Sequence, residues 1–84
     1  MTNAFGEALS SAQKSKTMHK MIAQYEDALG SEIGIHDKTR QQIDEDLSKI
    51  KKLASEASGG GISAADQRLI TRLEDTLRTH KYID

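Results

Sequence analysis

Hydrophobic residues recur at helical spacing in three stretches of the chain, and glycines separate these stretches. A glycine pair at 30 and 34 follows the first stretch, and three successive glycines at 59–61 follow the second. Glycine is common just past helix ends because it adopts backbone conformations that other residues resist. The pattern therefore predicts three helical segments, at roughly 3–29, 37–58 and 63–81.

The second segment has the most regular pattern. Its apolar residues are spaced alternately by four and three positions, which is typical of an amphipathic helix or a coiled-coil seam. They are Ile43, Leu47, Ile50, Ala54 and Ala57, with Leu53 widening the stripe. The opposite face is expected to stay in water and carries Glu45, Lys49, Lys52 and Glu56. We expect Asp37 to cap this helix and the acidic run 44–46 to lie in its first turns, where carboxylates complement the helix dipole.

The third segment begins with a marked capping sequence. Ser63 is expected to be the N-cap residue, and Asp66, three residues later, completes an acidic variant of the capping box. One apolar stripe follows, made of Leu69, Ile70, Leu73 and Leu77. His80 falls near this stripe, where we expect an amphipathic residue at the end of the bundle.

The first segment carries two apolar stripes that do not share a face. The later stripe is Met18, Met21, Ile22, Tyr25, Ala28 and Leu29, and the earlier one is Phe5, Ala8, Leu9 and Ala12. On an ideal helix the two are rotated by roughly 150°, so one straight helix cannot bury both against the same neighbours. We expect the polar, Ser-rich run 10–17 between them to form a kink, a break or a frayed stretch.

Composition favours helices and excludes several classes of protein. The 84 residues include no Val and only 4% aromatic residues, which disfavours strands. There is no Cys, which excludes disulfides and Cys-based zinc sites. No apolar run approaches the ~20 residues of a membrane span or resembles a signal peptide. We therefore expect a cytoplasmic location, unless a dedicated system exports the protein.

Candidate catalytic residues are few. His19, His36 and His80 fall on different segments without a metal-binding spacing, so we expect no metal site. The serines match no nucleophile motif. The glycines at 59–61 superficially resemble a phosphate-binding loop, but the Lys-Ser/Thr ending and the preceding strand of a P-loop are missing. We therefore expect neither an enzyme nor a cofactor.

Together these patterns predict an all-α fold, a small antiparallel three-helix bundle. The helical hairpin 37–58/63–81 packs with helix 17–29, and residues 1–16 form an N-terminal helical arm or extension of the single domain 17–84. The expected core is Met18, Ile22, Tyr25, Leu29, Ile43, Leu47, Ile50, Leu53, Leu69, Ile70, Leu73 and Leu77, with Ile33 and Ile35 closing the end near the first loop. So small a core is marginal alone, which makes oligomerisation or a partner physically reasonable.

The leading functional hypothesis is a non-enzymatic protein–protein interaction module, such as an adaptor, an inhibitor or a small assembly subunit. It would bind another protein or a second copy through the N-terminal strip, which we define as Phe5, Ala8, Leu9 and Ala12. The alternatives for this strip are a fold-back over the open end of the bundle, or disorder.

The second hypothesis is a small dimeric DNA-binding regulator. Its basic residues would be Lys14, Lys16 and Lys20, or the Arg face of the last helix with Arg68, Arg72, Arg78 and the neighbouring Lys81. A net charge of −1 gives no overall attraction to nucleic acid, and the glycine-rich connection at 58–62 is too long for a helix-turn-helix. Aromatic residues for stacking are also scarce, so this hypothesis ranks second.

Overall fold

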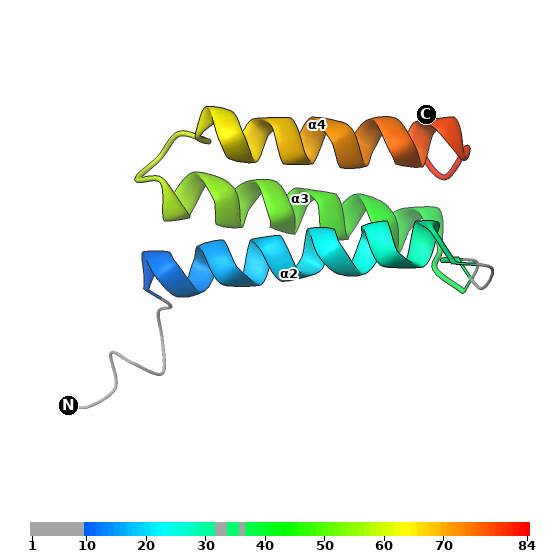
Figure 1. Cartoon of the computed structure of the whole chain (residues 1–84), viewed down its shortest axis with the longest axis horizontal. Coiled ribbons are helices and arrows are strands. Elements are labelled where there is room, and N and C mark those ends of the chain that lie inside the picture. Colours follow the sequence, from blue (N-terminus) through cyan, green and yellow to red (C-terminus); the bar gives the residue numbers. More distant parts are fainter. Residues whose placement is uncertain (1–9, 32–33, 36) are drawn as a thin grey trace.

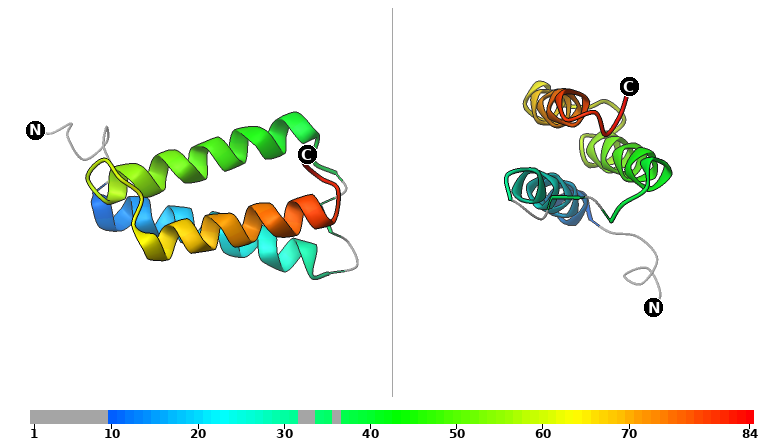
Figure 2. Two further views of the ribbon diagram at one scale, coloured as in Figure 1. Left: turned by 90° about the horizontal axis from the view of Figure 1, so that it is seen from above. Right: turned by 90° about the vertical axis from the view of Figure 1, so that its right-hand side faces the viewer.

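The computed structural model of the chain describes residues 10–31, 34–35 and 37–84. Within these residues it has three helices and no strand: α2 (Ser11–Leu29), α3 (Arg40–Ala57) and α4 (Ala64–Thr79). The helices run up, down and up, so α2 and α4 are parallel and α3 is antiparallel to both (Figure 1). Seen end-on they form a triangle (Figure 2). The predicted three-helix bundle is confirmed. In the part of the chain that the structure describes, no helix is long and apolar enough to cross a membrane.

The N-terminus of α2 differs from the expectation for run 10–17. Ser10 caps the helix and forms a full capping box with Gln13: the Gln13 N–H donates to Ser10 Oγ, and the Ser10 N–H donates to Gln13 Oε1, both at 3.2 Å. Because the serines supply the cap that a helix start needs, α2 begins at Ser11 instead of residue 17. From there the helix is continuous to Leu29, so the run 10–17 contains no kink or frayed stretch after Ser10. The expected break falls at the first residue of the run, where Ser10 is extended.

The cap of α3 was also predicted wrongly. Thr39, not Asp37, is the N-cap residue, and its hydroxyl accepts the Gln42 N–H at 3.1 Å. The helix therefore starts at Arg40, and its first turn contains no acidic residue. The acidic run 44–46 falls in the second turn, where the dipole of the helix start is already weak.

One half of the capping box predicted for α4 is confirmed. Ser63 is the N-cap residue, and its hydroxyl accepts the Asp66 N–H at 3.2 Å, as predicted. The Asp66 carboxylate contacts His19 of α2 at 3.1 Å instead of returning to the cap. This carboxylate joins two helices.

Two helices end in the same hydrogen-bonded turn, a Schellman motif. After α3 the Gly60 N–H donates to the Ser55 carbonyl at 2.8 Å, with Gly59 in the left-handed region at φ 80°. After α4 the Tyr82 N–H donates to the Leu77 carbonyl at 2.9 Å, with Lys81 at φ 64°. The glycine connection at 58–62 therefore begins with a defined turn.

The core consists of the predicted stripes. Its buried hydrophobic residues are Met18, Ile22, Tyr25, Ile35, Ile43, Leu47, Ile50, Leu53, Ala54, Ile70, Leu73 and Leu77. Two expected core residues, Leu29 and Leu69, are only half-buried and pack against its edge, as Met21 does. Ile33 lies outside the described residues.

The three pairs of helices do not pack equally closely. We expected α3 and α4 to form a compact hairpin with α2 across it, but α2 and α3 are the closest pair and α3 and α4 the loosest. Long side chains span the α3–α4 separation, where Lys51 Nζ lies 2.8 Å from Glu74 Oε2. The loose pair leaves a groove on this side of the bundle.

Candidate interaction surfaces

The N-terminal strip lies mostly outside the described residues. Of its four members the structure describes only Ala12, which lies in the first turn of α2 and is exposed. Met18, six residues later on the same straight helix, is fully buried. Six residues turn a helix by about 240°, so Ala12 and Met18 lie on different faces. Ala12, the only member of the strip that the structure describes, therefore does not lie on the face that packs in the core.

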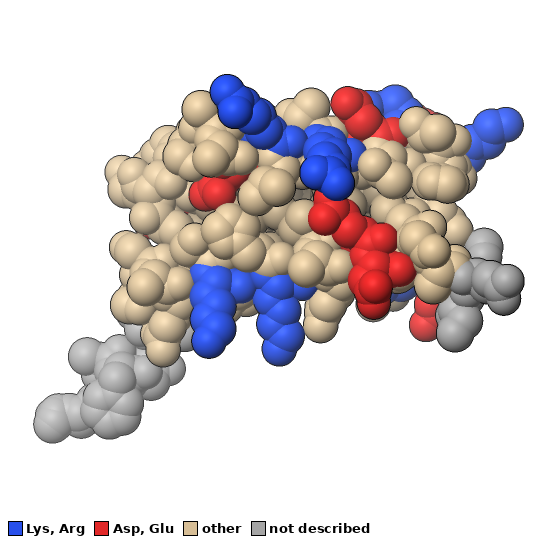
Figure 3. Space-filling view, viewed as in Figure 1, with Lys and Arg blue, Asp and Glu red and all other residues tan. Residues whose placement is uncertain are grey.

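The three lysines of α2 do not form one free cluster. Lys14 Nζ lies 3.1 Å from Glu56 Oε1 of α3, and this ion pair joins the two helices. Lys16 and Lys20 are exposed and make no ion pair with any residue that the structure describes. Figure 3 shows Lys and Arg side chains on the first half of α2 and along α4, with carboxylates between them. The basic surface is thus interrupted.

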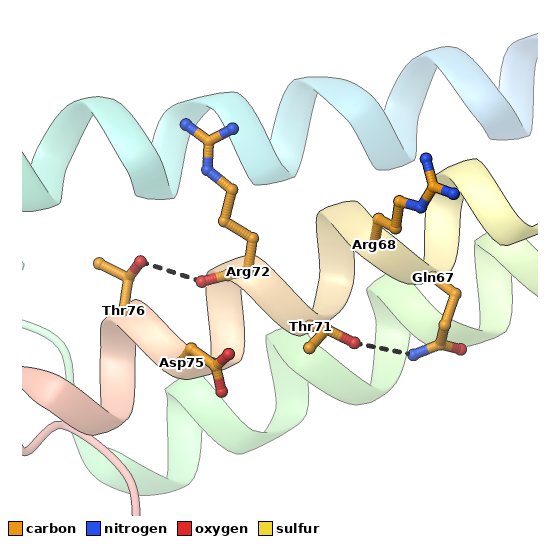
Figure 4. Close-up of a pocket in the computed structure, with 6 residues that line it drawn as sticks. All are labelled: Gln67, Arg68, Thr71, Arg72, Asp75 and Thr76. Atoms are coloured by element: carbon orange, nitrogen blue, oxygen red, sulfur yellow. Dashed lines mark hydrogen bonds between the residues drawn. The ribbon is translucent and has the colours of Figure 1, made fainter.

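The outer face of α4 forms a shallow hollow of about 420 Å³. Figure 4 shows its lining residues, all from α4: Gln67, Arg68, Thr71, Arg72, Asp75 and Thr76. Several of their polar groups are satisfied locally, since Thr76 donates to the Arg72 carbonyl at 2.9 Å and Gln67 to the Thr71 hydroxyl at 3.2 Å. No nucleophile is activated by a neighbouring base in this hollow.

Two of the three arginines of α4 form ion pairs within the molecule. Arg72 Nε lies 3.5 Å from Glu26 of α2, and Arg78 Nη1 lies 3.1 Å from Asp75. Arg68 is exposed and makes no ion pair within the described ranges. Of the basic residues considered for DNA binding, Lys16, Lys20, Arg68 and Lys81 are therefore without an ion pair in the described part of the chain.

The histidines are not brought together. His19, half-exposed on α2, contacts the buried carboxylate of Asp66, which is 9% exposed. His80 caps the other end of α4 and borders a hollow of about 270 Å³ with Glu26 and Arg72. His36 lies outside the described residues. Among the residues that the structure does describe, no group of three His, Asp or Glu side chains could hold a metal ion.

A cluster that the sequence did not predict joins α2 to α3. The Tyr25 hydroxyl donates to Asp46 Oδ2 at 2.5 Å, and Lys38 Nζ lies 3.7 Å from the same oxygen and 5.6 Å from the centre of the Tyr25 ring. Burial and the neighbouring Asp46 raise the pKa of Tyr25 above its usual value. The cluster borders a hollow of about 260 Å³ whose walls include Met21 and Ile35. The only signal in the sequence was a buried Tyr, whose hydroxyl needs a partner.

The C-terminal residues fold back into the α3–α4 groove, which the sequence also did not predict. Arg40 Nη1 lies 2.8 Å from Asp84 Oδ1, and Arg78 Nε donates to the Asp84 main-chain oxygen at 3.0 Å. The guanidinium of Arg40 lowers the pKa of the Asp84 carboxyl, which in turn raises the pKa of Arg40. Ile83 packs, half-buried, against the core between these contacts.

The comparisons with known proteins add no further constraint. No protein-family model, no curated protein and no solved structure matches this chain.

Proposed function

We propose that this protein is a non-enzymatic interaction module, a small adaptor, inhibitor or assembly subunit that docks on another protein or on a second copy through the N-terminal strip. The observation that carries the proposal is the exposure of Ala12 on a face of α2 that the core does not use. The other three members of the strip are Phe5, Ala8 and Leu9. Their apolar side chains are stabilised when a partner surface removes them from water.

The polar clusters of the bundle support the non-enzymatic part of the proposal. Tyr25 with Asp46 joins α2 to α3, and Asp66 with His19 joins α4 to α2. Each titratable group is thus bonded to a partner across a helix interface, as structural links are. An active site of the nucleophilic type would also hold a Ser, Thr, Cys or Lys nucleophile within hydrogen-bond reach of the base, and the side-chain hydrogen bonds that the structure describes in these two clusters include none.

The test is a pair of charge substitutions in the first residues. Phe5→Asp and Leu9→Asp place a carboxylate in the strip, and Asn3→Asp places the same charge next to it as the matched control. We expect both strip variants to lose association, measured as mass in solution over a range of concentrations and as binding of a partner isolated from the native source. Asn3→Asp keeps this association.

The urea unfolding of the same variants separates docking from folding. If the strip binds a partner, each substitution changes the free energy of unfolding of the monomer by less than about 0.5 kcal/mol. A loss of several kcal/mol would place the strip in the core of its own bundle, and unchanged association would remove its role in docking.

A second candidate function is a DNA-binding regulator. The observation that favours it is the exposure of Lys16, Lys20 and Arg68 without an ion pair in the described part of the chain. Lys14, Arg72 and Arg78 are paired with carboxylates, which leaves fewer cations for phosphates than the sequence predicted. Binding that weakens steeply with salt and is lost in Lys16→Ala/Lys20→Ala supports this function, and undetectable binding at low salt excludes it.

A further inference from the structure

We propose that the groove between α3 and α4 binds an acidic–aliphatic segment of a partner protein, and that Ile83 in this groove and Asp84 at its rim act as a built-in competitor. We call these two residues the C-terminal latch. The proposal does not rest on the N-terminal strip, because the latch and the beginning of α2 lie at opposite ends of the bundle (Figure 1).

The chain turns back onto the groove through a costly backbone conformation. Lys81 adopts φ 64°, a region that side-chain-bearing residues avoid, and the turn is closed by the hydrogen bond from Tyr82 to Leu77. Figure 2 shows the C-terminal segment leaving α4 toward the first turn of α3. The turn therefore delivers the latch to the loosest helix pair of the bundle.

The contacts of the latch define the chemistry that the groove accepts. One branched aliphatic side chain, Ile83, packs half-buried against the core. The Asp84 carboxylate that follows it lies 2.8 Å from Arg40, and Arg78 donates to the Asp84 main-chain oxygen. A ligand for this site thus combines an aliphatic residue with an adjacent carboxylate, because Arg40 and Arg78 stand next to the edge of the core on which Ile83 packs.

The groove has room for more than the latch. A hollow of about 380 Å³ remains beside Ile83. It is lined on α3 by Arg40, Asp44, Leu47 and Ser48 and across the groove by the Lys51–Glu74 ion pair, so it carries carboxylates as well as cations. Leu47 is buried and supplies apolar surface at its base. A partner segment longer than two residues could therefore make contacts that the latch does not.

The latch is held weakly enough to be displaced. The side chain of Asp84 is 96% exposed and that of Arg40 is 50% exposed, so water and salt screen their ion pair. Ile83 retains part of its surface in water. A partner that presents the same two groups on a preorganised segment competes with the latch without unfolding a helix.

The experiment uses the full chain and a synthetic peptide that copies residues 80–84. In the released variant, Ile83→Ser and Asp84→Asn are combined so that the latch loses both anchoring groups. Binding is followed by the NMR amide shifts of Leu47, Ser48 and Lys51. We expect the peptide to bind the released variant about tenfold more tightly than the wild type. This factor corresponds to a latch that covers the site in about nine of ten wild-type molecules, because only the uncovered molecules bind the peptide.

Two controls decide the result. A peptide with Ser and Asn in place of Ile and Asp should not bind, and Arg40→Ala in the released variant should weaken binding. Equal affinity for wild type and released variant, equal affinity for both peptides, or shifts outside the groove would each overturn the proposal. If the released variant does not fold, Asp84→Asn alone removes only the exposed ion pair and should raise the peptide affinity about two- to fivefold; no gain overturns the proposal.

Discussion

Tyr25 shows how one residue serves both the core and a polar contact. Its ring belongs to the apolar stripe of α2 and is 5% exposed, while its hydroxyl reaches Asp46 on α3. Ionisation of the phenol would break the hydrogen bond that it donates and place a negative charge beside a carboxylate. Burial and Asp46 therefore both raise the pKa of Tyr25.

This raised pKa predicts a loss of stability in alkali. The unfolded chain releases the Tyr25 proton near pH 10, whereas the folded chain holds it to higher pH. The contribution of Tyr25 is thus complete below pH 10 and falls as the pH rises toward the folded pKa. Urea unfolding of wild type and Tyr25→Phe should show a difference of about 1–2 kcal/mol at pH 7 that shrinks above pH 10. A difference that is constant with pH would contradict the shift.

Asp66 gives a second prediction at this scale. Its carboxylate is largely buried and contacts His19, while Asp75 on the same helix is exposed. Asp66→Ala should lower the free energy of unfolding by about 1–3 kcal/mol, because the link between α2 and α4 is lost. The matched Asp75→Ala should change it by less than about 0.5 kcal/mol. Equal effects of the two substitutions would argue against a structural role for the His19–Asp66 contact.

At the scale of the helices, short polar signals and left-handed residues decide where each element ends. Gly59 and Lys81 occupy the same position of the same motif, one after α3 and one after α4. Glycine takes this conformation without strain, whereas lysine pays about 1 kcal/mol for it. The ends of α3 and α4 therefore share one backbone conformation, which suits the residue of the first end and strains that of the second.

This pair predicts substitutions of opposite sign. Gly59→Ala should destabilise the bundle by about 1 kcal/mol through the backbone alone, since no atom lies within 4 Å of the added methyl group. Lys81→Gly should stabilise it by about 0.5–1 kcal/mol. Gly61→Ala, with equally open space and no positive φ, is the control and should be neutral or slightly stabilising. Thermal melts of the three variants check the order, and a stabilising Gly59→Ala would refute the motif.

The helix ends also show which local details the sequence can predict. Ser63 was recognised because it stands alone before a clear apolar stripe. Asp37 and Thr39 are both good caps two residues apart, and propensity does not choose between them. Ser10 and Gln13 form a capping box that was hidden in a run of serines, so the run was interpreted as a break. Local signals therefore predict that a helix exists better than they predict its first residue.

At the scale of the molecule, one core of buried stripes holds the three helices together. Stability in such domains is only roughly 0.05–0.15 kcal/mol per residue, so single core contacts matter. Leu73 and Leu69 are a useful pair because both belong to the predicted stripe of α4, yet the first is fully buried and the second half-buried. The difference between their contributions to stability measures how much burial in the core adds to membership of the apolar stripe.

Truncation of these two leucines should separate them. Leu73→Ala should cost about 2–5 kcal/mol because it removes buried methyl groups and leaves a cavity. Leu69→Ala should cost no more than about half as much, since part of the side chain already faces water. Urea midpoints at fixed slope give both values. If Leu69→Ala proves the more damaging, the edge of the core has been placed on the wrong side of α4.

Helical periodicity is a local property that can be read from the sequence. The core was predicted because nearly every buried residue belongs to one of the periodic apolar stripes. The sequence could not predict the Tyr25–Asp46 hydrogen bond, the Asp66–His19 contact or the latch on Arg40, since each depends on which faces of two helices meet. The sequence also predicted that α3 and α4 form a hairpin, but it could not predict that they pack least closely. The length of the loop that joins two helices does not determine the distance between them. Phe5, Ala8 and Leu9 lie outside the described residues, so the role of the strip in docking stays a prediction.

The proposed function depends on docking of the N-terminal strip on another molecule. The most direct measurement places a photo-crosslinking residue at position 5 of the full chain, in cells of the native source, with the exposed position 49 of α3 as the control. We expect position 5 to form an intermolecular adduct, with a partner protein or a second copy, and position 49 to form none. Crosslinks from position 5 into its own bundle, or no adduct at all, would contradict this expectation.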